Sequence, residues 1–167
     1  MKDLSGSLNG HVFTLLRKAV SQHNADAYIV GGYVRDLIMD RTSIDIDIVV
    51  VGSGIELAHT FARLVPKKTQ VTIFKNFGTA QVKFHDEIEW VIEFVGARKE
   101  SYRADSRKPI VEDGTLQDDQ NRRDFTINAM ALGLNENNFG KLIDPFGGLN
   151  DISQKIIRTR KRRECSG

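Results

Sequence analysis

The segment "SIDIDIVVV", residues 43–51, limits the possible folds more than any other part of the sequence. It is rich in β-branched residues, which favour strands, and side chains two positions apart in a strand point to the same side. Asp45 and Asp47 therefore share one face of the strand. The other face is apolar and carries Ile44, Ile46, Ile48 and Val50. Such a strand requires a sheet with one face packed on a core and the other facing a polar cleft or water.

The two aspartates lie close enough together to interact. Neighbouring carboxylates repel each other and raise each other's pKa unless a cation lies between them. Mg²⁺ suits such a pair, because it takes a few carboxylate oxygens and fills its other positions with water and phosphate. The alternative is a half-exposed strand whose polar face is merely acidic. Because apolar segments flank the strand on both sides, we predict that Asp45 and Asp47 are catalytic metal ligands in a cleft.

A third carboxylate would complete a two-metal site. In such a site the ions lie roughly 3.5–4 Å apart and bind the attacking and leaving oxygens of a phosphoryl transfer. Glu89 and Glu93, in "EIEWVIEF", share one face of another predicted strand. Glu93 lies deeper in the apolar run, where an unpaired charge would be costly. We therefore prefer Glu93 as the third catalytic carboxylate.

Gly31 and Gly32 separate a predicted strand, residues 27–30, from a predicted short helix. Glycines at such a junction let the backbone approach a ligand and direct its amide groups at a phosphate. A tight turn that needs a positive φ is the alternative explanation. Arg35 follows one helical turn along, where it can reach a triphosphate or pair with a carboxylate. Asp36 is predicted to have a structural role, holding either Arg35 or the start of the helix in place.

Further cationic candidates follow along the chain. Arg98 comes directly after the strand that carries Glu93. The stretch "RRDFTINA", residues 122–129, brings Arg122 and Arg123 to the predicted start of a helix. These two arginines bind phosphate or are simply solvated, and their position in the sequence favours neither alternative.

The pattern of apolar residues predicts helices and strands in one domain. Helices are predicted at residues 11–22, 33–39 and 55–65, and strands at residues 27–30, 43–51, 71–74, 79–84 and 88–95. The polar stretch from Arg98 to Gln117 predicts a surface loop. After it, residues 118–135 predict a helix that runs into a strand, residues 141–144 a strand and residues 145–151 a loop. We expect an α+β fold with a mixed, mainly antiparallel sheet, and α/β is the alternative.

Composition adds expectations about location. No apolar run approaches ~18 residues, so we expect no membrane span. The N-terminus lacks the pattern of a signal peptide, and the lone Cys165 fits a reducing compartment, so we expect a cytoplasmic protein. The net charge of +2 arises from "RTRKRRE", residues 158–164, because the remainder of the chain is slightly acidic. Such a basic segment contacts phosphate backbones or is solvated.

Six short motifs follow one another along the chain. They are "GGYVRD", "DID", "NFGTAQV", "EFVGAR", "RRDFTINAMA" and "LIDPFGGLNDI". This combination resembles the head region of the class II tRNA nucleotidyltransferase and bacterial poly(A) polymerase family, which includes the CCA-adding enzymes. The resemblance extends over residues 27–158, nearly the whole chain.

The resemblance implies a polymerase-β-like nucleotidyltransferase fold. It also implies Mg²⁺-dependent transfer of AMP or CMP from ATP or CTP to the 3′ end of a tRNA. In that family pattern, Asp45 and Asp47 would hold the catalytic metals, and Glu93 matches an acidic strand position. The positions that would contact the nucleotide are Gly31, Gly32, Arg35, Arg98, Arg123 and Asp124.

The resemblance also sets the expected domain organisation. Residues 1–158 would form the head domain, including an N-terminal helix within residues 8–22, and residues 159–167 a short basic tail. Family members continue past "KIIRT" into a helical neck that reads the base and into regions that grip the tRNA. We therefore expect a partial enzyme with low activity by itself. A poly(A) polymerase of the same family and a non-catalytic RNA-binding module are the alternatives, and the oligomeric state stays open.

Overall fold

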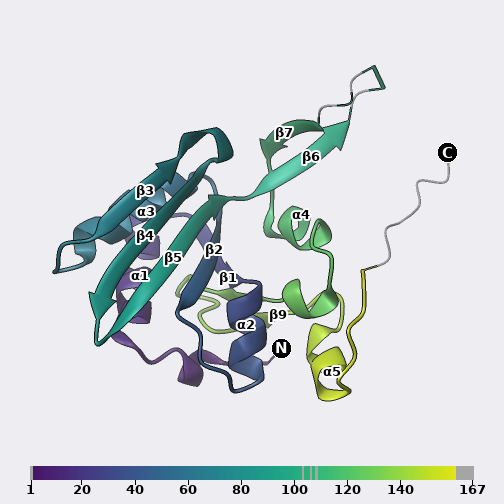
Figure 1. The fold of residues 1–167 in the computed structure, drawn as a ribbon, viewed down its shortest axis with the longest axis horizontal. Coiled ribbons are helices and arrows are strands. Elements are labelled where there is room, and N and C mark those ends of the chain that lie inside the picture. The colour runs from purple at the N-terminus through teal and green to yellow at the C-terminus, as the bar shows by residue number, and fades with distance from the viewer. Residues whose placement is uncertain (1, 103, 106, 108, 161–167) are drawn as a thin grey trace.

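A seven-stranded sheet forms the centre of the protein (Figure 1). The computed structural model describes residues 2–102, 104–105, 107 and 109–160. In sheet order the strands are β3 (Gln70–Phe74), β4 (Thr79–Asp86), β5 (Ile88–Gly96), β2 (Asp45–Val51), β1 (Asp26–Val30), β8 (Ala131–Gly133) and β9 (Leu142–Ile143). Strands β2 and β5 run parallel, whereas the other neighbours run antiparallel. The expected α+β class with a mixed, mainly antiparallel sheet is therefore confirmed, and the α/β alternative is excluded.

One face of the sheet packs on the main hydrophobic core. The helices are α1 (His11–His23), α2 (Gly32–Ile38), α3 (Gly54–Leu64), α4 (Leu116–Asn121) and α5 (Gly148–Ser153), with 3-10 turns at Ser5–Ser7, Lys75–Phe77 and Thr126–Asn128. In Figure 1, α1 and α3 lie behind the sheet. The predicted apolar stripe of α1 is entirely buried there, and so are Ile46 and Ile48 from the apolar side of β2. Burial of these side chains is the main force that holds the two helices on the sheet.

The opposite face is only partly covered. A small apolar cluster of Val30, Val49, Ala97 and Ala131 lies on it, and Leu116 of α4 packs against this cluster. Val49 follows Asp45 and Asp47 at two-residue spacing, so it shares their side of β2. The acidic half of this face stays open, which is the arrangement that the alternating pattern of residues 43–51 requires.

The predicted surface loop from Arg98 to Gln117 is wrong for most of its length. Strands β6 (Arg98–Tyr102) and β7 (Pro109–Asp113) pair as an antiparallel hairpin, which projects away from the main sheet in Figure 1. In a two-stranded hairpin the outward backbone groups can bond to water, so the strands need no buried apolar face. The hairpin therefore lacks the alternation from which strands are predicted.

The region around "RRDFTINA" also differs from the prediction. Thr115 caps α4 in a reciprocal arrangement with Asp118, and the helix already ends at Asn121. Arg122 and Arg123 thus follow the end of a helix instead of opening one. After them come the short 3-10 turn and β8, so the long predicted helix is replaced by two short turns of helix.

The C-terminal part contains a helix where a loop was predicted. Asp144 accepts hydrogen bonds from the backbone N–H groups of Gly148 and Leu149, and these contacts anchor the first turn of α5. Farther along, Thr159 pairs with Phe125, and the N–H of Arg160 donates to the carbonyl of Asp124. Most of the predicted basic tail, residues 161–167, and with it Cys165, lies outside the described residues. None of the helices in the described part is long and apolar enough to cross a membrane.

Candidate active site

The open face of the sheet brings three carboxylates onto adjacent strands. In the parallel pairing of β2 with β5, Asp47 lies directly opposite Glu93, and Asp45 lies opposite Val91. Glu89 shares this face but lies two residues beyond Val91, so it has no aspartate opposite it. Asp45 and Asp47 are exposed, whereas Glu93 is half-buried. The structure therefore places Glu93, rather than Glu89, beside the predicted aspartate pair.

Asp47 lies at the centre of this acidic group. Solvent reaches it from the open side, but the surrounding protein displaces part of its hydration, and this burial raises the pKa of its carboxyl group. The negative charge of Glu93 raises that pKa further, Arg123 opposes the rise, and Asp45 and Asp119 add smaller increases. The acidic charge on this face thus exceeds what the nearby arginine neutralises, and a bound cation would remove the excess.

The donor set fits a hard divalent ion. Across the part of the chain that the structure describes, no three His, Cys, Asp or Glu side chains converge on one metal position. An ion at Asp45 and Asp47 would therefore take a small number of protein oxygens and complete its shell with water and phosphate. Mg²⁺ binds in this way, because it loses its waters reluctantly and prefers one or two carboxylates plus substrate phosphates.

The glycine turn lies next to the acidic group. Gly31 has φ of 75° and ψ of −137°, a conformation that other residues rarely adopt. A Cβ atom built on Gly31 would lie 3.1 Å from Nη1 of Arg123 and 3.8 Å from Oδ2 of Asp47. The turn therefore needs glycine both for its conformation and for space. The turn also brings the backbone close to Arg123 and to the predicted metal ligand Asp47. A tight turn with positive φ and close approach to a ligand are therefore compatible explanations of the glycine pair.

Arg35 connects the two specific motifs of the sequence. Its Nε donates to Oδ1 of Asp36 at 3.1 Å, and its Nη1 donates to Oδ1 of Asn128 at 2.9 Å. The predicted role of Asp36 as the partner of Arg35 is confirmed. A Cβ atom at Gly32 would lie 3.4 Å from Nη2 of Arg35, which is an ordinary van der Waals contact. Contact of Arg35 with a triphosphate stays a prediction.

Asp119 is a charged residue of this region that the sequence pattern did not single out. It is 0% exposed, and its two carboxylate oxygens accept hydrogen bonds of 2.8 Å from Nη2 of Arg122 and Nε of Arg123. The spacing of three and four residues is the one at which side chains meet on a helix. The position of Asp119, three residues before Arg122 and four before Arg123, was therefore the feature of the sequence that could have predicted these ion pairs.

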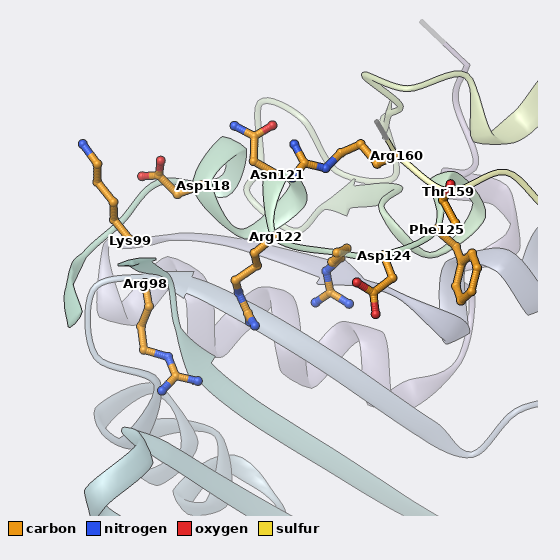
Figure 2. A pocket seen from close by; sticks show the side chains of 10 residues that line it. Arg98, Lys99, Asp118, Asn121, Arg122, Asp124, Phe125, Thr159 and Arg160 are labelled. Atoms are coloured by element: carbon orange, nitrogen blue, oxygen red, sulfur yellow. The ribbon is translucent and has the colours of Figure 1, made fainter. Parts of the chain in front are cut away.

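A basic cleft of about 860 Å³ opens beside α4. It is lined by Arg98, Lys99, Asp118, Asn121, Arg122, Arg123, Asp124, Phe125, Thr159 and Arg160. Figure 2 shows the side chains of Arg98, Arg122 and Asp124 extending to the same side of α4. Asp124 is exposed, and Nε of Arg98 is buried but makes no hydrogen bond among the described residues.

The predicted residues thus fall into two connected groups. Gly31, Asp47 and Arg123 meet at the glycine turn, while Arg98 and Asp124 lie in the cleft. Arg123 belongs to both groups, because it also lines the cleft. An acidic face of the sheet therefore lies next to a cleft lined mainly by basic and polar side chains, with Arg123 at the boundary.

Known proteins are similar to this chain in sequence and in fold. The family model of the poly A polymerase head domain matches residues 27–158. The A-adding tRNA nucleotidyltransferase of Aquifex aeolicus (strain VF5) is 46% identical over 132 residues, which cover 79% of this chain and 15% of that protein. The CCA-adding enzyme of Bacillus subtilis (strain 168) is 41% identical over 135 residues, which cover 80% of this chain and 31% of that protein.

A solved structure of a similarly named enzyme also resembles this chain in fold. A tRNA nucleotidyltransferase complexed with a primer tRNA and an incoming ATP analog matches with a TM-score of 0.70 and 40% identity, covering 86% of this chain and 38% of that one. The chain therefore spans well under half the length of the relatives that it matches. The expected polymerase-β-like nucleotidyltransferase fold is confirmed, and this chain belongs to the poly A polymerase head domain family.

Proposed function

We propose that this chain is the catalytic head of a nucleotidyltransferase that transfers AMP or CMP from ATP or CTP to the 3′ end of a tRNA. The observation that carries the proposal is the meeting of Asp47, Gly31 and Arg123, with Glu93 opposite Asp47. Negative groups that can hold a metal, a backbone turn that admits a ligand and a cation that can bind phosphate are the parts that phosphoryl transfer requires.

Asp45 and Asp47 would hold Mg²⁺, with Glu93 beside them. A Mg²⁺ ion held there would lower the pKa of the attacking 3′-hydroxyl and would offset the charge of the departing pyrophosphate. Glu93 increases the negative potential at Asp47 and so favours occupation by a cation. Because little covalent chemistry falls to the protein, positioning and charge stabilisation would provide most of the rate.

The triphosphate would lie between the glycine turn and the cleft. Gly31 and Gly32 leave room for the phosphates to approach the backbone, and Arg123 directs Nη1 toward this turn. Arg35, whose Nη1 donates to Asn128, would contribute a further positive charge to phosphate binding. Arg98 and Asp124 line the cleft next to Arg123, where the phosphates or the ribose of the nucleotide or the end of the RNA would bind.

The comparisons favour tRNA as the acceptor. The relatives are named as A-adding and CCA-adding enzymes, and the matching solved complex holds a primer tRNA and an ATP analog. A poly(A) polymerase is not favoured by these names. A non-catalytic RNA-binding module does not need a carboxylate cluster next to a glycine turn, whereas this chain has one.

Metal-dependent nucleotide binding tests the proposal. Binding of ATP, CTP, GTP and UTP would be measured with and without Mg²⁺, for the wild type and for Asp45→Ala/Asp47→Ala. We expect Mg²⁺ to strengthen nucleotide binding to the wild type but not to the double variant. A preference for ATP and CTP would favour a CCA-adding enzyme, whereas equal binding of the four nucleotides would place base selection in the neck region of the family. Asp26→Ala is the matched control, because it removes an exposed carboxylate from the neighbouring strand β1, away from the glycine turn.

Transfer to RNA is the second arm of this test. Labelled ATP and CTP would be supplied with a tRNA that ends before its terminal CCA. Metal-dependent labelling of the tRNA by the wild type, and none by the double variant, is the expected result. Equal nucleotide binding by the wild type and the double variant would contradict the proposal.

A further inference from the structure

Asp119 is a buried charge with a specific pair of partners. It lies in α4, is 0% exposed, and gives one carboxylate oxygen to Arg122 and the other to Arg123. Removing a carboxylate from water is costly unless charge-assisted hydrogen bonds compensate for it. The two arginines provide this compensation, while their own side chains are 39% and 22% exposed. The acid is thus hidden, but the arginines that it holds face the cleft.

The geometry of the contact leaves part of Arg123 free for a ligand. Asp119 accepts from Nε of Arg123, whereas Nη1 lies at the glycine turn, 3.1 Å from the Cβ position of Gly31. A guanidinium held through Nε keeps its plane and direction, so its remaining N–H groups stay aimed at one place.

A competing partner for Arg123 lies close by. Nη1 of Arg123 and Oδ2 of Asp47 lie 3.1 and 3.8 Å from the same Cβ position of Gly31, so these opposite charges are close enough to attract each other. Without a second acid to hold it, the Arg123 guanidinium could move onto Asp47 and occupy an oxygen that a metal ion would use. Asp119 opposes this movement because it offers a carboxylate that solvent does not screen.

We propose that Asp119 is a positioning residue that holds Arg122 and Arg123 toward the phosphates of the bound nucleotide and keeps Arg123 off the metal ligand Asp47. This inference rests on the proposed function of the chain as a nucleotidyltransferase head. Asp119 itself does not touch the nucleotide. It acts through the two arginines, in the manner of an outer residue that orients the groups contacting a ligand.

The neighbouring residue Gln120 provides a matched control. It is 3% exposed, and its Nε2 donates to the carbonyl oxygens of Ala129 and Ile143 at 2.9 and 3.2 Å. These bonds attach α4 to the chain around β8 and β9. Gln120 is therefore almost as buried as Asp119 and lies on the same helix, but its side chain makes no hydrogen bond to the arginines.

The test compares Asp119→Asn with Gln120→Met in the full chain. Asparagine preserves the shape of the side chain, but its amide nitrogen cannot accept from a second arginine. With Mg²⁺ present, we expect Asp119→Asn to weaken ATP binding about tenfold, the size of one lost charge-assisted contact, and to leave AMP binding unchanged. Gln120→Met is expected to lower the melting temperature without changing the affinity for ATP.

A double variant separates positioning from general damage. If Asp119 acts only through the two arginines, adding Asp119→Asn to Arg122→Met/Arg123→Met has no further effect on ATP affinity. Arg123→Lys serves if Asp119→Asn does not fold, because lysine keeps the charge but cannot be held through Nε. That variant is expected to lose ATP affinity to a similar extent.

A readout without nucleotide keeps this inference distinct from the proposed function. The NMR signals of the Nε–H groups of Arg122 and Arg123 should show ordered side chains in the wild type and mobile ones in Asp119→Asn. Failure of wild-type ATP binding would overturn the proposed function, and the NMR signals would still decide the role of Asp119. Unchanged signals in Asp119→Asn, or equal loss of ATP affinity in Gln120→Met, would overturn the positioning role.

Discussion

Gly31→Ala changes both the backbone and the contents of the candidate site. Gly31 has φ of 75° and ψ of −137°, and its added methyl group would lie 3.1 Å from Nη1 of Arg123. A non-glycine residue in such a conformation costs about 1–3 kcal/mol. For a domain of this size, each kcal/mol lowers the melting temperature by about 2–4 °C. We therefore expect a fall of roughly 2–12 °C.

The functional loss in Gly31→Ala should exceed the loss of stability. The methyl group pushes the Arg123 guanidinium away from the turn and fills space that a phosphate would occupy. Loss of one charge-assisted contact and of close backbone approach predicts a decrease in Mg²⁺-dependent ATP affinity of at least about tenfold. Calorimetric titration with ATP would measure the affinity, and differential scanning calorimetry the melting temperature.

Gly52→Ala is the matched control for Gly31→Ala. Gly52 also has a positive φ, 136°, but nothing lies within 4 Å of its Cβ position. It follows the last residue of β2, at the other end of the strand from Asp45. A similar fall in melting temperature with unchanged ATP affinity is expected. If the two variants lost ATP affinity equally, or if Gly31→Ala bound ATP like the wild type, the assignment of the glycine turn to phosphate binding would be wrong.

Three further predictions concern the core, the motif contact and pH. Phe61→Ala removes a fully buried ring that packs between two other phenylalanines, each with its ring centroid 5.6 Å away. Urea unfolding should show a free energy of unfolding lower by about 3–5 kcal/mol, and a decrease below about 1 kcal/mol would contradict the core packing. Asn128→Ala frees Nη1 of Arg35, and ATP affinity should fall severalfold with little change in melting temperature; no change in affinity would exclude Arg35 from the site. Burial raises the pKa of Tyr33 to about 12 from an ordinary 10.0, so the folded state favours the neutral phenol. Its contribution to stability is complete below pH 10.0 and is lost as the pH rises to about 12, and Tyr33→Phe should show a shallower decline in that window by urea unfolding.

Local patterns in the sequence predicted the elements that carry the site. Alternation at residues 43–51 predicted both the buried side of β2 and the shared face of Asp45 and Asp47. The apolar stripe of residues 11–22 predicted α1 almost to its observed bounds. These patterns succeed because burial on one side of an element repeats along the chain with a fixed period.

The contacts across the site depend on register, which local patterns do not contain. Glu93 faces Asp47 because β2 and β5 pair in parallel, although α3, β3 and β4 separate them in the chain. Parity predicted the face of Glu93, but a shift of four residues would have placed Glu89 opposite Asp47 instead.

Short-range polar contacts account for the other differences. Asp119 binds two arginines at helical spacing, and Asp144 starts α5 through its contacts with backbone N–H groups. Among the described residues, strands β6 and β7 pair only with each other. None of these three features produces an apolar pattern, so an analysis based on hydrophobic periodicity misses them.

The position of a bound metal ion would show whether Asp45 and Asp47 form the catalytic metal site. Crystals of the chain with Mn²⁺ in place of Mg²⁺ and a non-hydrolysable ATP analogue would locate the ion by its anomalous signal. The account predicts a peak about 2.1 Å from oxygens of Asp45 and Asp47, shared with the phosphates of the analogue beside Gly31. A peak elsewhere, or an analogue bound away from the two aspartates and the glycine turn, would contradict it.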